Sequence, residues 1–281
     1  MKIKHLLCFI ALCLFFTPGK AQQLSVMTLR NGATVYIWED KSKPDVFGMI
    51  AFKVGSVDDP EQYTGLAHYL EHVMFKGTQT IDALDWEKEK PIYEKIIAKY
   101  DERAALSDPA AREAIDKEIN DLTREAAQYA AGNEFSLLVD HMGGQGLNAS
   151  TGYDQTEYHN SFPPSQLEKW LEIYSERLID PVFRGFQTEL EAVYEEYNMY
   201  NDDRGSRMRE FIYEQAFGDH PYARPIIGLP EHLKNPQLSK LIDFYNTWYG
   251  PQNMSIILVG NIDAKEAIPM IRDKFERVPR R

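Results

Sequence analysis

The sequence predicts an α+β fold in which a mainly antiparallel sheet packs against helices. Residues 24–29 alternate in polarity and residues 34–38 are rich in β-branched and aromatic side chains, as strands are. Asn31-Gly32 between them favours a tight turn, which joins antiparallel neighbours. Helical patterns with an apolar stripe follow along the rest of the chain. The apolar fraction of 43% in 281 residues suits a soluble globular protein and excludes a disordered, collagenous or multi-span membrane protein.

The other elements follow in order along the chain. Residues 46–54 are apolar enough for a strand buried on both faces. Residues 55–63 form a polar loop, which leads into a helix at about residues 64–74. Two short strands are expected within residues 147–159, and a further strand at residues 254–259. Later helices are expected at about residues 165–179, 188–200, 207–216, 239–248 and 265–275.

A highly charged segment, residues 82–131, reads as a helical hairpin inserted into this pattern. Asp108 and Pro109 supply a cap and a first-turn proline for its second arm. That arm carries an apolar stripe at helical spacing, made of Ile115, Ile119, Leu122, Ala126 and Tyr129. We interpret the hairpin as a solvated insertion packed on the surface. A partner-binding coiled coil is the alternative.

The first residues resemble a secretory signal peptide. Residues 1–21 combine a basic start, an apolar run of about 11 residues and small residues before Gln22. An uncleaved anchor is the alternative, but a transmembrane helix needs roughly 20 apolar residues. We therefore expect an exported protein, periplasmic or secreted, with no stable membrane anchor. Cys8 and Cys13 both lie in this segment, so the mature chain would lack any thiol.

Charge narrows the class of partner. The chain has 43 acidic and 31 basic residues, and its net charge of −12 makes a nucleic-acid partner unfavourable.

The central chemical signal is His68-Tyr69-Leu70-Glu71-His72. In a helix, residues i and i+4 lie on one face, so both imidazoles can bind one ion. Glu71 then lies beside the ion as a general base, in the order of the inverted zinc-peptidase motif.

A third ligand is expected from the second acidic helix, at about residues 188–200. Glu189 and Glu196 are seven residues apart and share a helical face. Spacing alone does not rank the four carboxylates of this helix, Glu189, Glu191, Glu195 and Glu196. The alternative for the histidine pair is a surface helix that carries two histidines by chance.

The chain resembles the pitrilysin/insulinase-type zinc metallopeptidases, the family that includes mitochondrial processing peptidase. The resemblance is most specific in residues 65–78, GLAHYLEHVMFKGT, and in the preceding GSVDDP at residues 55–60. It continues through LNAST at residues 147–151, through residues 189–196, and through YGPQNM at residues 249–254. It covers nearly the whole chain after residue 21, except the charged hairpin.

The resemblance implies a role for each matching residue. His68, His72 and Glu196 match the ligands of one Zn²⁺ per chain, and Glu71 matches the general base. Glu189 matches the acidic residue that supports catalysis. Asn148 and Ala149 match the edge strand that pairs with the backbone of an extended peptide, although Asn148 could instead be a turn residue. His141 and His159 match nothing in the pattern.

The resemblance also implies a partner. The family's working unit is a clamshell of two homologous lobes, and residues 22–281 match the N-terminal catalytic lobe alone. We therefore expect a zinc metalloendopeptidase lobe acting on peptides or unfolded proteins, together with a second homologous lobe or subunit. The alternatives are a catalytically weak or inactive lobe that binds peptides, and a zinc hydrolase acting on non-peptide amides.

Overall fold

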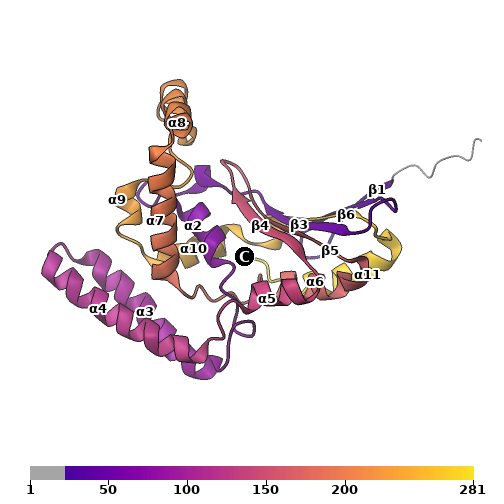
Figure 1. The fold of residues 1–281 in the computed structure, drawn as a ribbon, viewed down its shortest axis with the longest axis horizontal. Coiled ribbons are helices and arrows are strands. Elements are labelled where there is room, and N and C mark those ends of the chain that lie inside the picture. Colours follow the sequence, from indigo (N-terminus) through magenta and orange to yellow (C-terminus); the bar gives the residue numbers. More distant parts are fainter. Residues whose placement is uncertain (1–22) are drawn as a thin grey trace, which may run out of the picture.

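A six-stranded mixed sheet organises the fold. The computed structural model describes residues 23–281, so the signal peptide predicted at residues 1–21 lies outside the described residues. The strand order is β1-β2-β6-β3-β5-β4 (Figure 1). Only the pair β2 and β6 is parallel within this sheet, so the predicted mainly antiparallel arrangement is confirmed. The strands are β1 (Gln23–Thr28), β2 (Thr34–Glu39), β3 (Val46–Phe52), β4 (Gln145–Thr151), β5 (Thr156–Phe162) and β6 (Met254–Gly260).

Local sequence explains the first hairpin of the sheet. Gly32 has φ of +104°, which an L side chain rarely adopts, and its N–H donates to the Leu29 carbonyl at 3.0 Å. The Asn31 amide donates to the Phe275 carbonyl at 2.7 Å, which ties the turn to the last helix. Along β3, buried residues alternate with half-buried ones. One face of β3 is therefore buried and the other half-buried, where burial on both faces was predicted.

Three helices cover one face of the sheet: α5 (Glu134–His141), α6 (Leu167–Glu176) and α11 (Ala264–Phe275) (Figure 1). Trp170 of α6 is fully buried, and its ring stacks on Phe162 of β5 with centroids 5.1 Å apart. Gly48 of β3 makes room for it, because a Cβ there would lie 2.5 Å from the Trp170 ring. Helix α5 was not predicted from the sequence.

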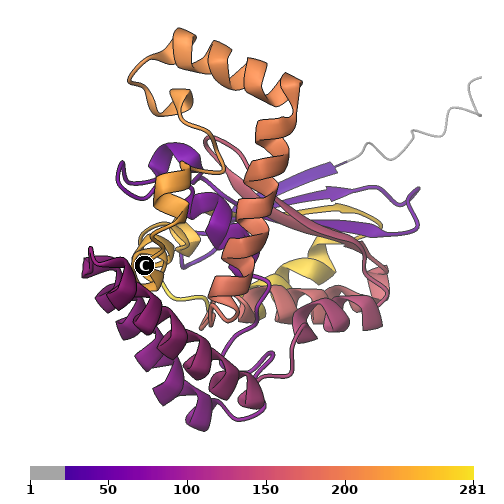
Figure 2. The ribbon, with the colours of Figure 1, turned by 60° about the vertical axis from the view of Figure 1, so that its left-hand side comes forward.

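A second group of helices forms the other part of the molecule: α2 (Leu66–Val73), α7 (Phe186–Asp202), α8 (Arg204–Phe217), α9 (Pro230–Leu233) and α10 (Leu238–Trp248). Helix α7 runs beside α2, and α8 continues from α7 and stands away from the body (Figures 1 and 2). All but the short α9 were predicted to within a few residues. Short 3₁₀ turns cover Ser56–Asp58, Ala127–Tyr129, Pro164–Gln166, Pro221–Ala223 and Pro251–Asn253.

The charged segment forms the two antiparallel helices that its sequence predicts, α3 (Trp86–Ala105) and α4 (Pro109–Ala126) (Figure 2). Asp108 caps α4 by accepting a hydrogen bond from the Ala111 N–H at 3.2 Å. Ile115 and Ile119 of the predicted stripe are buried, whereas most charged side chains of the hairpin face solvent. No helix within residues 23–281 is both long enough and apolar enough to cross a bilayer.

Candidate metal centre

Helix α2 carries both histidines, and its first turn is fixed by a buried carboxylate. Asp59 is 5% exposed and accepts hydrogen bonds from the N–H groups of Gly65 at 2.7 Å and Ala67 at 2.9 Å. Burial raises the pKa of Asp59 to about 7, although these N–H donors favour its charged form. Gly65 has φ of +90°, and a Cβ there would lie 2.6 Å from the Ile227 carbonyl oxygen. The segment predicted as a polar loop therefore anchors the helix that bears the motif.

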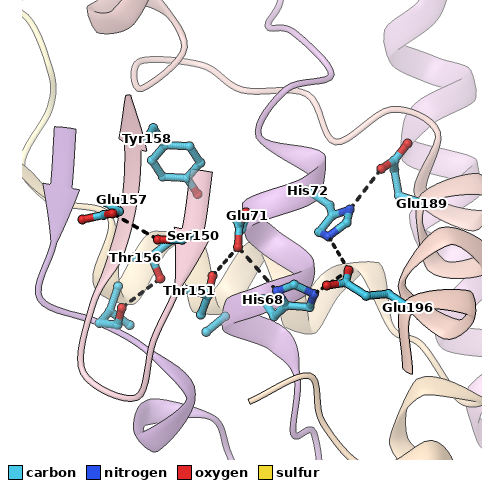
Figure 3. Close-up of polar contacts among 12 residues, drawn as sticks. His68, Glu71, His72, Ser150, Thr151, Thr156, Glu157, Tyr158, Glu189 and Glu196 are labelled. Atoms are coloured by element: carbon cyan, nitrogen blue, oxygen red, sulfur yellow. Dashed lines mark hydrogen bonds and ion pairs between the residues drawn. The ribbon is translucent and has the colours of Figure 1, made fainter. Parts of the chain in front are cut away.

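The histidine pair and one glutamate converge on a single point. His68 and His72 lie on one face of α2, with ring centroids 4.9 Å apart. Glu196 of α7 directs Oε2 between them, 3.3 Å from His68 Nε2 and 3.5 Å from His72 Nε2 (Figure 3). One ligand atom from each of the three residues lies within 4.8 Å of the others. Two imidazole nitrogens and one carboxylate oxygen are a donor set that zinc accepts at catalytic sites.

The electrostatics of this cluster also suit a cation. Burial opposes the charged form of His72, but hydrogen bonds to Glu189 and Glu196 outweigh it and raise the pKa of His72 to about 9. The pKa of His68 is raised in the same way, because Glu196 and Glu71 outweigh its burial. The two imidazoles in turn lower the pKa of Glu196 well below its ordinary value. The carboxylates thus stabilise positive charge at the point where the three residues meet.

The structure separates the four glutamates that spacing alone could not rank. Glu196 contacts both histidines, whereas Glu189 contacts only His72. Glu189 Oε2 lies 3.5 Å from His72 Nδ1, and its Oε1 lies 2.5 Å from Lys76 Nζ. The contact with His72 and that with Lys76 lower the pKa of Glu189, against its partial burial. Glu191 and Glu195 of the same helix are exposed. Glu189 can therefore orient the His72 ring through the nitrogen that faces away from Glu196.

Glu71 lies on the opposite side of His68. It is 8% exposed, and its Oε2 accepts a hydrogen bond from the Thr151 hydroxyl at 2.6 Å. The same oxygen lies 3.4 Å from His68 Nδ1. Glu71 thus lies beside the cluster but is not one of the three residues that supply its ligand atoms (Figure 3). Thr151 belongs to β4 and was not predicted as part of the site.

Asn148 and Ala149 also lie on β4, which is an edge strand of the sheet as predicted. They pair with His159 and Tyr158 of β5. The other edge of β4 borders a cleft of about 590 Å³ that contains the histidine cluster. Further cleft residues that were not assigned a role from the sequence include Phe75, Lys76, Tyr153, Tyr200, Arg209 and Ile227. Phe75 and Lys76 lie in the quoted run at residues 65–78, and Tyr200 follows Glu196 by one helical turn.

His141 and His159, which match nothing in the pattern, do not join the cluster. His141 is exposed at the end of α5. The His159 ring packs near Phe47 with centroids 5.4 Å apart, on β5 and β3. The motif histidines alone therefore reach Glu196 among the histidines of residues 23–281.

Comparison with known proteins identifies the family of this chain and several relatives. Residues 34–90 and 122–229 match the family described as insulinase (peptidase family M16), and residues 237–281 match its "inactive domain". The probable zinc protease PqqL of Escherichia coli is 25% identical over 92% of this chain and 23% of its own length. The zinc protease PqqE of Helicobacter pylori is 24% identical over 89% of this chain and 46% of its own length.

Solved structures agree on the fold. A protease from Helicobacter pylori superposes with a TM-score of 0.71 and 22% identity, over 92% of this chain and 51% of that one. The first half of the periplasmic protease PqqL of Escherichia coli superposes with a TM-score of 0.68 and 25% identity, over 92% of this chain and 47% of that one. Pitrilysin superposes with a TM-score of 0.68 and 22% identity, over 94% of this chain and 24% of its own. The chain spans about half or less of each of these relatives. It belongs to the insulinase family, peptidase family M16.

Proposed function

We propose that this chain is the catalytic lobe of an exported zinc metalloendopeptidase that hydrolyses extended peptides or small unfolded proteins. The observation that carries the proposal is the convergence of His68, His72 and Glu196 on one point, with Glu71 beside it. The relatives PqqL and PqqE, which are named as zinc proteases, support the proposed activity. PqqL is described as a periplasmic protease, which supports export. The predicted signal peptide at residues 1–21 agrees with export.

In this proposal His68, His72 and Glu196 hold one zinc ion per chain. Bound zinc would supply Lewis acidity, which polarises a carbonyl and lowers the pKa of water towards roughly 7. Glu189, itself paired with Lys76, keeps the His72 ring in place, because it contacts the nitrogen that faces away from the ligand position. Tyr200, one turn beyond Glu196, lines the same cleft.

Glu71 is the proposed general base. Its carboxylate takes a proton from the attacking water and later gives a proton to the leaving amine. The hydrogen bond from the Thr151 hydroxyl holds Oε2, which leaves Oε1 free to receive the proton. Burial of Glu71 keeps its position defined within the cleft.

Strand β4 is the proposed peptide-binding element. An extended peptide can add to its open edge, pairing with backbone groups at Asn148 and Ala149 beside the cluster. Backbone pairing fixes the direction of the peptide, while the side chains of the cleft select its sequence. This supports cleavage of extended segments over cleavage of compact folded proteins.

We further propose that a second homologous lobe or subunit completes the enzyme, because the chain spans only part of its two-lobed relatives. The alternative is a lobe that binds peptides with weak or no turnover. The complete His68, His72, Glu196 and Glu71 set favours catalysis.

The test is the Glu71→Gln variant, with metal analysis and a peptide-cleavage assay run with and without a candidate second lobe. The wild-type chain should contain about one zinc and cleave peptides when the second lobe is present. Glu71→Gln should retain the zinc and lose roughly 10²- to 10⁴-fold in kcat, because the proton acceptor is gone. Full hydrolysis by Glu71→Gln would overturn the proposed base. Absence of zinc from the wild-type chain would overturn the metal site.

A further inference from the structure

A buried arginine contacts the end of α2 and has no carboxylate partner within residues 23–281. Arg177 follows the last residue of α6 and is 1% exposed. Its guanidinium carbon lies 4.3 to 5.5 Å from the ring centroids of Phe75, Phe135, Tyr158 and Tyr174. These distances are within the range of cation–π attraction. Four aromatic faces thus enclose one positive charge.

The hydrogen bonds of this guanidinium point to the end of α2. Nη2 donates to the carbonyl of Met74, the residue that follows α2, at 3.0 Å. Nε and Nη1 have no hydrogen-bond partner within residues 23–281. Burial lowers the pKa of Arg177, as expected for a cation without a facing carboxylate. The charged group therefore has one polar contact, and that contact is to the helix that carries the two histidines.

A second arginine, Arg184, whose side chain is 9% exposed, shows the ordinary arrangement. Arg184 forms a bidentate pair with the buried Glu89, with Nε to Oε1 at 2.6 Å and Nη2 to Oε2 at 2.8 Å. Removing one member of such a pair leaves an uncompensated buried charge and strongly destabilises the fold. Arg177 has no such pair, so the cost of burying its charge offsets much of what its aromatic contacts and single hydrogen bond contribute. Arg177 is therefore expected to contribute less to stability than Arg184.

The position of Arg177 offers a functional reason instead. A cation at the end of a helix interacts favourably with the helix dipole and with its free carbonyls. Met74 is two residues after His72, and Phe75, which stacks on the guanidinium, lines the cleft. The guanidinium thus connects the end of α6 to the last turn of α2 and to one wall of the cleft.

We propose that Arg177 is a positioning residue for the metal centre, which holds the end of α2 so that His72 faces Glu196. The proposal rests on the proposed function, because it concerns the same zinc site. It assigns to Arg177 an effect on metal affinity and not on global stability. It also predicts that a cation at this position matters, and not only the volume of the side chain.

The test compares Arg177→Met, Arg177→Lys and Arg184→Met in two measurements on the full chain. The first is the Tm of the apo protein in the presence of a chelator, since bound zinc would itself raise Tm. The second is the zinc Kd by competition with a chromogenic chelator. We expect Arg177→Met to keep Tm within ~3 °C and to bind zinc about tenfold more weakly. Arg177→Lys should recover most of the affinity, and Arg184→Met should lose roughly 10 °C in Tm.

Three results would overturn the proposal. One is wild-type zinc affinity in Arg177→Met. Another is a loss of apo Tm in Arg177→Met as large as that of Arg184→Met, which would make Arg177 a residue of the fold alone. The third is an Arg177→Lys variant as weak as Arg177→Met. A wild-type chain that binds no zinc would instead overturn the proposed function, so the two failures are distinguishable.

Discussion

The hairpin of α3 and α4 and the cleft between α2 and α7 use the same charged residue types in opposite ways. In the hairpin, Lys99 contacts Glu102 at 2.8 Å and Glu118 at 2.7 Å, and both carboxylates are at least half exposed. In the cleft, carboxylates and imidazoles from two helices converge on one point, and Glu189 is 16% exposed there. In the hairpin, Lys99 thus forms ion pairs at the surface. In the cleft, the side chains of His68, His72 and Glu196 instead lie close enough together to bind one metal ion.

This difference separates two roles for acidic helices. Exposed pairs contribute little to stability, because water screens them and side-chain entropy opposes them. Half-buried titratable groups that lie close together shift one another's pKa strongly, as they raise that of His72 to about 9. The composition of residues 82–131 is more charged than that of the cleft helices, yet the chemistry lies in the latter. Convergence, and not charge density, marks the site.

The largest expected effect is on metal affinity and uses a matched pair of variants. Glu196→Gln removes a proposed ligand, whereas Glu118→Gln removes an exposed carboxylate of the hairpin. We expect Glu196→Gln to weaken zinc binding by more than ~100-fold, which exceeds the loss typical of outer contacts. Glu118→Gln should leave it unchanged. Equal zinc Kd values for the two variants, measured by chelator competition, would remove the distinction between the two regions.

A smaller effect is expected from the buried cap of α2. The pKa of Asp59 is raised to about 7 in the folded chain, above its unfolded value of roughly 3.9. Its protonated form is thus favoured by folding, so its contribution is complete below about pH 4 and is lost as the pH rises through 7. Between these limits it lowers the free energy of unfolding by up to about 1.4 kcal/mol per pH unit. Glu89, a buried acid of the hairpin, is instead paired with Arg184.

The measurement is urea unfolding of the apo wild type and of Asp59→Asn at pH values from 4 to 8. The free energy of unfolding of the wild type minus that of the variant should decrease with rising pH, because the asparagine side chain of the variant does not titrate. Using the difference removes the contribution of other groups. A difference that is constant, or that increases with pH, would show that the charged form of Asp59 is the one favoured by folding.

The smallest effect belongs to the hairpin surface. Lys99→Met removes the cation shared by Glu102 and Glu118 while keeping the aliphatic stem. We expect only a slight fall in Tm, and a smaller one at high salt, because water and ions screen these exposed charges. Zinc affinity should not change. A fall in Tm as large as that expected for Arg184→Met would mean that the hairpin charges form a cooperative network.

Local patterns predicted most of the fold. The Asn31-Gly32 turn, the Asp108-Pro109 helix start and the stripe of Ile115 and Ile119 each lie where the sequence places them. The parallel pairing of β2 with β6 could not be predicted, because it joins residues more than 200 positions apart. Helix α5 was missed, since its pattern is short and follows a glycine.

The part of the site that lies on one helix could likewise be predicted from local sequence spacing. The spacing of His68 and His72 indicates a shared face, because both lie on one helix. Spacing could not separate Glu196 from Glu191 or Glu195, since that depends on how α7 is rotated against α2. The Thr151 contact to Glu71 and the burial of Asp59 depend on tertiary packing, which leaves no local signal. The resemblance to a family supplied the choice of Glu196 as third ligand, which spacing could not.

The central claim is that His68, His72 and Glu196 form one zinc site. Anomalous diffraction at the zinc edge from crystals of the zinc-loaded chain tests it most directly, because it locates the ion. The account predicts one dominant peak, about 2.0 to 2.2 Å from an imidazole nitrogen of each histidine and from a Glu196 oxygen. A dominant peak at other carboxylates, such as those of the hairpin, or no peak in the cleft, would contradict it.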